Sequence, residues 1–179
     1  YLMRLFVGLV PSGESLVRIE AGCPPLLPAG SRRVPSANLH LTLVFVAQYP
    51  KEEVEKLKQV LGKEVFQGIT AFYLQPSRLY WHRNTLWLEL REDAHLTELA
   101  ARLHQLLGVP FRRPFRPHVT LARLYSPYRL PLGSYPLRIG EEPLLFPEAY
   151  LFQSHLSRGG AVYERLARYP LLAASNLPL

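Results

Sequence analysis

Two short segments of this chain repeat one pattern, NLHLTL at positions 38–43 and RPHVTL at positions 116–121. Side chains along a β-strand alternate between two faces, with a period of two residues. A strand through the first segment therefore buries its leucines on one face and places His40 and Thr42 together on the other. A strand through the second segment does the same for His118 and Thr120. The pattern predicts two half-buried strands, each with a histidine and a hydroxyl on its open face.

The recurrence of the pattern is more informative than either copy. One histidine beside one threonine is readily explained as a structural residue with satisfied hydrogen bonds. Here two of the six histidines have threonine two positions later and leucine after that, and each motif comes after a loop that contains arginine and proline. The remaining histidines, which lack the pattern, are His82, His95, His104 and His155. Two matched motifs favour one shared site.

Two histidines with two hydroxyls suit acid–base chemistry on a phosphate. An imidazole has an unperturbed pKa of about 6.5, so one ring can accept a proton while the other donates one. The hydroxyls of Thr42 and Thr120 can donate hydrogen bonds to phosphate oxygens as negative charge develops on them.

Other kinds of site fit the residues less well. A catalytic zinc site has three protein ligands as a rule, and neither motif contains Asp, Glu or Cys. The single cysteine, Cys23, lies in a segment rich in proline and glycine, and no G-x-S-x-G motif is present. We therefore expect no metal at this site and no nucleophilic serine or cysteine.

The rest of the chain predicts an α+β fold. Apolar periodicity and helix caps predict helices at 14–21 (capped by Ser12 and ended by Gly22), 51–62 and 94–108 (capped by Asp93), and strands at 4–10, 39–46, 69–75, 85–91, 118–124, 148–156 and 161–169, with loops at 23–35 and 110–117 and turns at 125–136. Each half of the chain supplies a helix, a basic loop and a strand with His-x-Thr. We expect a single domain over residues 1–179, made of two similar, interleaved lobes whose sheets are backed by helices.

The formal charge of +7 is consistent with an anionic partner, although a compositional bias toward arginine would produce the same excess. The positions of the arginines are more specific than their number. Arg32 and Arg33 precede the first motif, and Arg112, Arg113 and Arg116 precede the second. If the two strands meet, these loops form basic rims around the histidines that could follow a phosphate backbone.

Aromatic side chains near the motifs are candidates for stacking on bases, namely Phe6, Tyr80, Trp81, Phe111 and Phe115, although core packing is the simpler explanation for each of them. Strict alternation turns Arg123 away from the face that carries His118, so we expect Arg123 only at the edge of the site.

The apolar segments are too short for a protein that spans a membrane with helices. No apolar run reaches the ~18 residues of a membrane-spanning helix, and we read the apolar N-terminal stretch as a first strand. A single cysteine allows no intrachain disulfide and fits a reducing cytoplasm. We expect a cytoplasmic monomer with no membrane partner.

The two H-x-T-L motifs make this chain resemble the 2H phosphoesterases, and among them the RNA 2′,3′-cyclic phosphodiesterases, also called 2′-5′ RNA ligases. Supporting segments are RLFVGL at 4–9, RLYW at 78–81, PFRPHVTLAR at 114–123 and the ending at 151–171. The stretch HRN at 82–84 departs from the small apolar residues expected there.

The resemblance implies a bilobal, pseudo-twofold fold in which two mainly antiparallel sheets line a central cleft, with helices on the outside. It also implies a site without metal or cofactor. In such enzymes the first histidine is the proton donor and the second the proton acceptor. Carried over, His118 would activate water, and His40 would protonate the departing 3′ oxygen to leave a 2′-phosphate. A reversible 2′-5′ RNA ligase activity would use the same residues.

The expected partner is RNA, or a nucleotide, that ends in a 2′,3′-cyclic phosphate. Arg32, Arg33, Arg113 and Arg116, with Phe6 and Trp81, are the candidates for binding it. Two alternatives remain open at this point: a non-catalytic RNA-binding module on the same scaffold, and a phosphodiesterase for small cyclic nucleotides such as an ADP-ribose cyclic phosphate.

Overall fold

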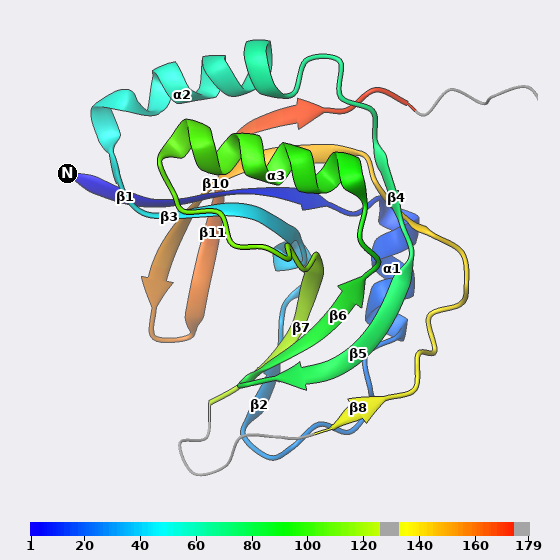
Figure 1. The fold of residues 1–179 in the computed structure, drawn as a ribbon. Helices are drawn as coiled ribbons and strands as arrows, with labels where there is room; N and C mark the ends of the chain where they lie inside the picture. Colours follow the sequence, from blue (N-terminus) through cyan, green and yellow to red (C-terminus); the bar gives the residue numbers. More distant parts are fainter. Residues whose placement is uncertain (126–132, 174–179) are drawn as a thin grey trace, which may run out of the picture.

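A computed structural model describes residues 1–125 and 133–173 of the chain (Figure 1). Nine strands form one sheet in the order β11-β10-β1-β3-β7-β6-β5-β8, and β2 also pairs with β7. A separate two-stranded sheet contains β4 and β9. The strands are β1 Leu2–Val10, β2 Ser31–Arg33, β3 Leu41–Pro50, β4 Phe72–Leu74, β5 Pro76–His82, β6 Thr85–Leu90, β7 His118–Leu124, β8 Ser134–Tyr135, β9 Leu144–Phe146, β10 Glu148–Ser157 and β11 Gly160–Pro170.

The large sheet consists of two parts that meet at a narrow seam. We call β11-β10-β1-β3 the first half, and β7-β6-β5-β8 with β2 the second half. The register between β3 and β7 consists of one antiparallel residue pair, Leu41 with Val119, whereas β1 and β3 are paired over most of their length. The expected two sheets are therefore one continuous sheet, because the two motif strands pair with each other at the centre. The antiparallel α+β architecture is otherwise as predicted.

Helices cover the side of the sheet that faces away from the motif side chains. They are α1 Gly13–Ala21, α2 Val54–Val60 and α3 Ala94–Leu107, with short helical turns η1 Ser36–Asn38, η2 Lys51–Glu53 and η3 Leu61–Val65. In Figure 1, α2 and α3 lie together above the first half, and α1 lies beside the second. None of the helices within the described ranges has the length and apolar character needed to span a bilayer.

The apolar face of the seam belongs to the core. Leu41 and Val119 have no exposed surface, and they share one cluster with Leu88, Leu99 and Leu103. Burial of a Leu or Val side chain contributes about 1.5–3 kcal/mol. The leucines of the two motifs therefore anchor the centre of the sheet and leave its other face free for polar side chains.

Local signals placed the helices well. Ser12 accepts a hydrogen bond from the Ser15 amide, and Asp93 accepts one from the Leu96 amide, as N-caps do. Gly108 ends α3 with φ 68, which is the left-handed conformation that favours glycine at a helix end.

Four short strands were not predicted, namely β2, β5, β8 and β9. β2 lies within the expected loop at 23–35, because the edge of β7 at Ala122–Leu124 gives its arginine-rich segment a pairing partner. Of the turns expected at 125–136, residues 126–132 lie outside the described part of the chain.

Candidate active site

The two motifs meet in one cleft of about 530 Å³. His40, Thr42, His118 and Thr120 all line it, and Arg4, Phe6, Asn38, Phe45, Arg123, Tyr125, Ser154 and Tyr163 are among the other lining residues. The pairing of Leu41 with Val119 explains the geometry. In an antiparallel pair the residues on either side of the paired positions face the opposite way, so both His-Thr pairs project to one side. Four polar side chains from two distant segments thus share one space.

Each motif strand carries a bulge immediately after its threonine. On β3, the partner of Gly8 is Thr42 and the partner of Val7 is Val44, so Leu43 is the additional residue. On β7, Trp87 pairs with Thr120 and Leu86 with Ala122, so Leu121 is the additional residue. The two bulges occupy corresponding positions and relate the two halves of the sheet.

The bulge on β7 overturns one prediction. An extra residue shifts the alternation by one, so the position three after the threonine turns to the cleft rather than away from it. Arg123 therefore lines the cleft together with His118 and Thr120, contrary to strict parity. Phe45 occupies the corresponding place on β3 and also lines the cleft.

His40 lies among aromatic rings and has a defined tautomer. Its ring centroid is 4.7 Å from that of Phe6 and 5.4 Å from that of Tyr163. Nδ1 is 2.7 Å from the Asn38 carbonyl oxygen, which can only accept, so Nδ1 carries the hydrogen. In the neutral ring, Nε2 then accepts from the Thr42 hydroxyl at 2.9 Å. The protonated ring would instead offer an Nε2–H to the cleft.

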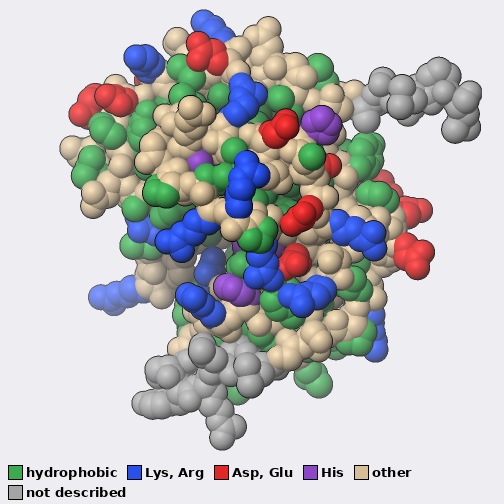
Figure 2. Space-filling model, viewed as in Figure 1, with side chains coloured by type: hydrophobic (Ala, Val, Ile, Leu, Met, Phe, Trp, Pro, Cys, Tyr) green, Lys and Arg blue, Asp and Glu red, His purple; other side chains and the backbone are tan. Residues whose placement is uncertain are grey.

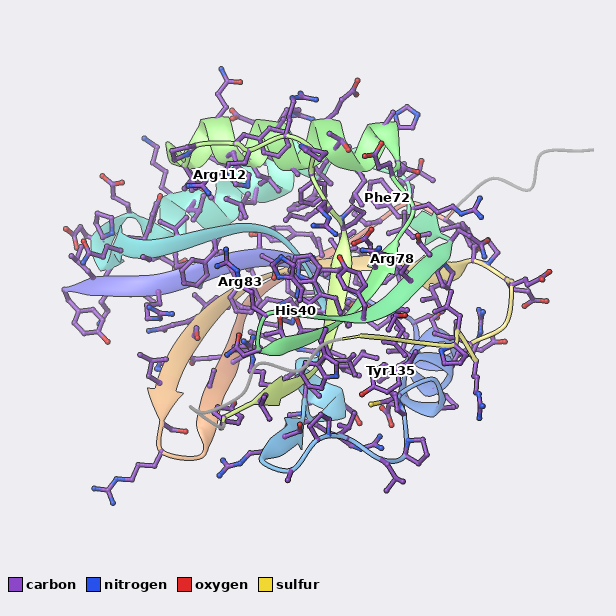
Figure 3. All side chains as sticks on the ribbon, turned by 60° about the horizontal axis from the view of Figure 1, so that its bottom comes forward. His40, Phe72, Arg78, Arg83, Arg112 and Tyr135 are labelled. Carbon is purple, nitrogen blue, oxygen red and sulfur yellow. The ribbon has the colours of Figure 1, made fainter. Side chains whose placement is uncertain are left out.

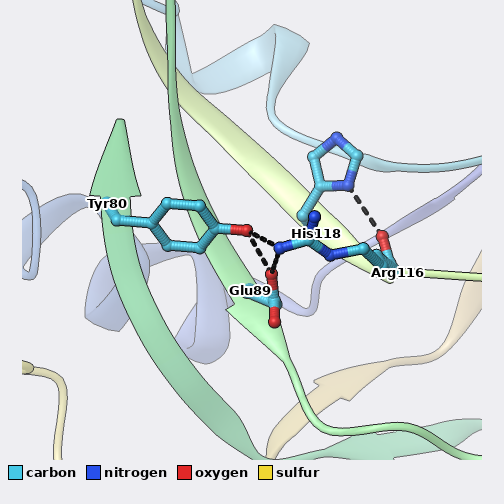
Figure 4. A network of polar contacts seen from close by, with 4 residues as sticks. All are labelled: Tyr80, Glu89, Arg116 and His118. Carbon is cyan, nitrogen blue, oxygen red and sulfur yellow. Dashed lines mark hydrogen bonds and ion pairs between the residues drawn. The ribbon is translucent and has the colours of Figure 1, made fainter. Parts of the chain in front are cut away.

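His118 makes a hydrogen bond similar to that of His40, but a different aromatic side chain packs against it. Its Nδ1 donates to the Arg116 carbonyl at 2.9 Å (Figure 4), so the lone pair of its neutral ring is on Nε2. The indole of Trp87 stacks on the imidazole, with centroids 3.5 Å apart and planes 10° apart. His82 stacks on the other face of Trp87 at 4.0 Å. The position and the tautomer of His118 are thereby fixed before any ligand binds.

Both imidazoles favour the neutral state in the free protein. The pKa of His40 is lowered to about 4, chiefly by burial; the Asn38 hydrogen bond opposes this shift, and the positive charges of His118 and Arg123 add to it. Burial also lowers the pKa of His118, and the charge of His82 acts in the same direction, whereas the Arg116 carbonyl and Glu89 raise it. An anion between the two rings would favour protonation of either one.

The arginines of the first loop lie beside the cleft. Arg32 and Arg33 line an adjoining cavity of about 130 Å³ that shares Asn38, Arg123 and Tyr163 with it. The guanidinium of Arg32 lies over the Tyr125 ring at 5.2 Å. Arg33 donates to the Pro24 carbonyl at 2.6 Å.

The arginines of the second loop are not among the residues that line the cleft. Arg116 donates to Glu89 at 2.9 Å and also to the Tyr80 hydroxyl, which in turn donates to Glu89 (Figure 4). Arg113 lies over the Phe111 ring at 5.2 Å. The backbone of the second loop therefore orients His118 through the Arg116 carbonyl, while the guanidinium groups of Arg113 and Arg116 contact other side chains.

The aromatic candidates divide in the same way. Phe6 lines the cleft behind His40, although only 3% of its surface is exposed. Trp81 faces the core, with 7% exposed and its indole N–H donated to the Tyr135 hydroxyl at 3.0 Å. Phe111 and Phe115 pack against the core cluster. Trp81 was wrongly expected at the binding site, because β5 was not recognised as a strand whose alternation buries it.

Several cleft residues were not predicted. Arg4, Asn38, Ser154 and Tyr163 line the cleft, although none of them was singled out as a site residue. Trp87 is not among the lining residues but stacks on His118, because β6 pairs with β7. The alternation of TLWLEL over β6 could have identified Trp87 as facing away from the core, but nothing local indicates that β6 pairs with β7.

The surface around the cleft is basic. Figure 2 shows Lys and Arg side chains gathered near a hollow in the lower middle of the molecule, with a histidine among them. Within the part of the chain that the structure describes, no group of three or more His, Cys, Asp or Glu side chains is placed to hold a metal ion. A second cavity, of about 420 Å³, lies between α3 and β4 and contains neither motif.

Comparison with known proteins identifies relatives that match nearly the whole chain, including both motifs. The family model described as LigT-like phosphoesterase matches residues 7–80 and 88–163, and each matched segment contains one His-x-Thr motif. An RNA 2′,3′-cyclic phosphodiesterase of Thermus thermophilus is 30% identical over 94% of this chain and 90% of its own length. One of Bacillus subtilis is 25% identical over 93% and 95%, respectively.

Solved structures agree with the sequence relatives. The crystal structure of Escherichia coli LigT complexed with 3′-AMP has a TM-score of 0.73 and 26% identity, and the match covers 96% of this chain and 99% of the other. A crystal structure of a Thermus thermophilus protein gives the same values.

Proposed function

This chain belongs to the LigT-like phosphoesterase family, and from that premise we propose that it is an RNA 2′,3′-cyclic phosphodiesterase that leaves a 2′-phosphate. One observation carries the proposal: His40, Thr42, His118 and Thr120 line a single cleft beside Arg123. Relatives that are named RNA 2′,3′-cyclic phosphodiesterase support the substrate class. The related LigT crystal structure with 3′-AMP supports a ligand that contains a nucleoside and a phosphate.

His118 is the proton acceptor in this proposal. Its Nδ1–H is bound to the Arg116 carbonyl, so the neutral ring has its lone pair on Nε2. The lowered pKa keeps the ring neutral near pH 7, as a base must be before it acts. His118 takes a proton from water, and the water oxygen forms a bond to the phosphorus of the cyclic phosphate.

His40 is the proton donor. The bond from phosphorus to the ribose 3′ oxygen breaks as the water oxygen attacks, and protonated His40 supplies the proton that this oxygen needs. The aromatic surroundings that lower its pKa make its protonated form a strong acid. The negative charge of the bound phosphate offsets part of the burial and favours that form. The more enclosed histidine is thus the acid, and the ring stacked on Trp87 is the base.

Thr42, Thr120 and Arg123 hold the phosphate. Donors placed where negative charge develops stabilise the transition state, and removal of one costs about 10²–10³ in rate in comparable sites. The two threonines come from opposite sides of the seam, so each can reach a different non-bridging oxygen. The guanidinium of Arg123 supplies a forked, permanently charged donor, and Arg123 also lines the adjoining cavity that contains Arg32.

The same groups would support 2′-5′ ligation. A 5′-hydroxyl of a second RNA strand then replaces water, loses its proton to His118 and bonds to phosphorus, while the 3′ oxygen departs with a proton from His40. The atoms balance as in hydrolysis, and no cofactor enters the reaction.

The test is hydrolysis of an oligonucleotide that ends in a 2′,3′-cyclic phosphate, with EDTA present. We expect His40→Ala and His118→Ala to reduce kcat by about 10²–10⁴ each. His95→Ala is the matched control, because His95 lies on α3 and lines the other cavity. Full activity in either motif variant would refute the two-histidine mechanism, and loss of activity with EDTA would refute metal independence. RNA binding without turnover would support a binding module instead.

A further inference from the structure

The face of β5 and β6 that lies beyond His118 is not part of the cleft lining, although it points the same way. Leu79 and Trp81 on β5, and Leu86 and Leu88 on β6, are buried in the core. Alternation therefore turns the residues between them to the opposite face, the one that carries His118. These residues are Arg78, Tyr80, His82, Thr85, Trp87 and Glu89.

Stacked rings run across this face without interruption. His118 on β7 stacks on Trp87 of β6 at 3.5 Å, and Trp87 stacks on His82 of β5 at 4.0 Å, with interplanar angles of 10° and 20°. The Tyr80 ring meets Trp87 edge-on at 6.2 Å. Because the rings hold one another in place, these protein side chains lose little conformational entropy when a ligand binds to them.

The charges of this face are strongly unbalanced. Its carboxylate, Glu89, is bound by Arg116 and by the Tyr80 hydroxyl. Arg78 lies over the Tyr80 ring at 3.9 Å, and Arg83 stands at the β5–β6 turn with φ 56. Neither takes part in an ion pair within residues 1–125 and 133–173. Figure 3 shows Arg78 and Arg83 projecting on either side of His40.

We propose that this face, which we call the β5–β6 face and define as Arg78, Tyr80, His82, Arg83 and Trp87, binds the RNA strand on the 5′ side of the terminal cyclic phosphate. The inference rests on the proposed function, which places the terminal phosphate beside His118. A cyclic phosphate ends the 3′ side of a strand, so any further nucleotides extend in the 5′ direction. Adjacent strands are about 4.8 Å apart, so β5 lies about 10 Å from β7, a short step for a nucleotide chain.

The chemistry of the face fits single-stranded RNA. Arg78 and Arg83 are placed to meet backbone phosphates, as the basic residues of grooves that bind single strands do. The faces of Trp87 are covered by His118 and His82, so the ring edges offer apolar contact to ribose and bases in place of stacking. The separation of the two functions is clear: the cleft acts on the terminal phosphate, and the β5–β6 face selects for a longer chain.

The experiment compares the double variant Arg78→Ala/Arg83→Ala with Lys56→Ala/Lys63→Ala, which removes the same charge from the outer helices. Fluorescence anisotropy measures binding of a labelled hexanucleotide that ends in a 2′-phosphate, as a function of salt. Each phosphate contact in a single strand contributes about 0.7 to the slope of log K against log salt, so loss of two contacts lowers the slope by about 1.4. The lysine control keeps the slope of the wild type.

Turnover provides a second readout. We expect the ratio of kcat/KM for a cyclic-phosphate-ended hexanucleotide to that for a mononucleotide 2′,3′-cyclic phosphate to fall about tenfold in the arginine variant. An unchanged slope with normal turnover refutes the β5–β6 face and leaves the proposed function intact. A lowered slope in a protein that hydrolyses neither substrate refutes the proposed function and leaves the face intact. An equal change in the lysine control also refutes the face.

Discussion

The two motif strands have the same backbone design and opposite surroundings. In each, the histidine Nδ1 donates to the carbonyl two residues earlier, Asn38 or Arg116, and a bulge follows the threonine. His40, however, sits among Phe6, Phe152 and Tyr163, whereas His118 has the flat face of Trp87. Shared geometry thus places both imidazoles at one cleft, and the neighbouring rings make them chemically different.

Position 8 shows how the difference arises. Gly8 pairs with Thr42 as Trp87 pairs with Thr120. A Cβ on Gly8 would come within 3.0 Å of the Leu41 carbonyl oxygen and 3.2 Å of the His40 ring. The first half therefore has no side chain where the second half has an indole, and the His40 ring occupies space that Trp87 fills in the second half.

The largest effects should separate the two histidines by role. With a cyclic phosphate, His40→Ala and His118→Ala are both expected to lose about 10²–10⁴ in kcat. With an aryl phosphodiester, whose leaving group departs without a proton, His40→Ala should recover most of its loss while His118→Ala should not. Steady-state rates on both substrates give the answer. If His118→Ala alone recovered its rate on the aryl phosphodiester, His118 would be the proton donor and His40 the proton acceptor.

A smaller effect should appear at the threonines. Thr42→Val and Thr120→Val each remove one donor to the phosphate, and we expect a loss of about 10²-fold in kcat/KM. Thr42 also donates to His40 Nε2, so its variant should alter the pH profile as well, whereas Thr120→Val should lower the rate at every pH equally. Identical profiles would show that the Thr42–His40 hydrogen bond has no part in proton donation.

A smaller effect still concerns the pH at which kcat/KM is highest. Catalysis requires protonated His40 and neutral His118. The value of kcat/KM is therefore highest between the two pKa values and falls at higher and at lower pH. Both pKa values are lowered from the ordinary value, that of His40 to about 4. The optimum of kcat/KM should therefore lie below pH 6.5. An optimum above pH 7 would mean that burial does not lower the pKa of at least one of the two histidines.

His82 offers a finer test on the second half alone. Its positive charge lowers the pKa of His118, so His82→Gln should raise that pKa and leave His40 unaffected. NMR titration of the imidazole resonances reads both rings without substrate. A change confined to His40 would contradict the stacked arrangement.

Local patterns predicted the features that depend on neighbouring residues. The period of two placed His40 with Thr42 and His118 with Thr120, and capping residues located α1 and α3. The misplaced Arg123 shows the limit of such reasoning, since the bulge at Leu121 exists only because β6 pairs with β7 on both sides of it. Trp87 and Tyr163 were missed because their nearness to the histidines depends on contacts between distant segments.

The walls around His40 have a consequence for the way the protein comes into being. Phe6 lies near the start of the chain, and Phe152 and Tyr163 lie more than a hundred residues after His40. A ribosome releases these parts at different times, so His40 lacks two of its three neighbouring rings until the β10–β11 hairpin is synthesised and added to the sheet. Until then its imidazole titrates as an ordinary surface group. The acidity proposed for catalysis is therefore acquired only after β10 and β11 have been made, and shorter chains would not possess it.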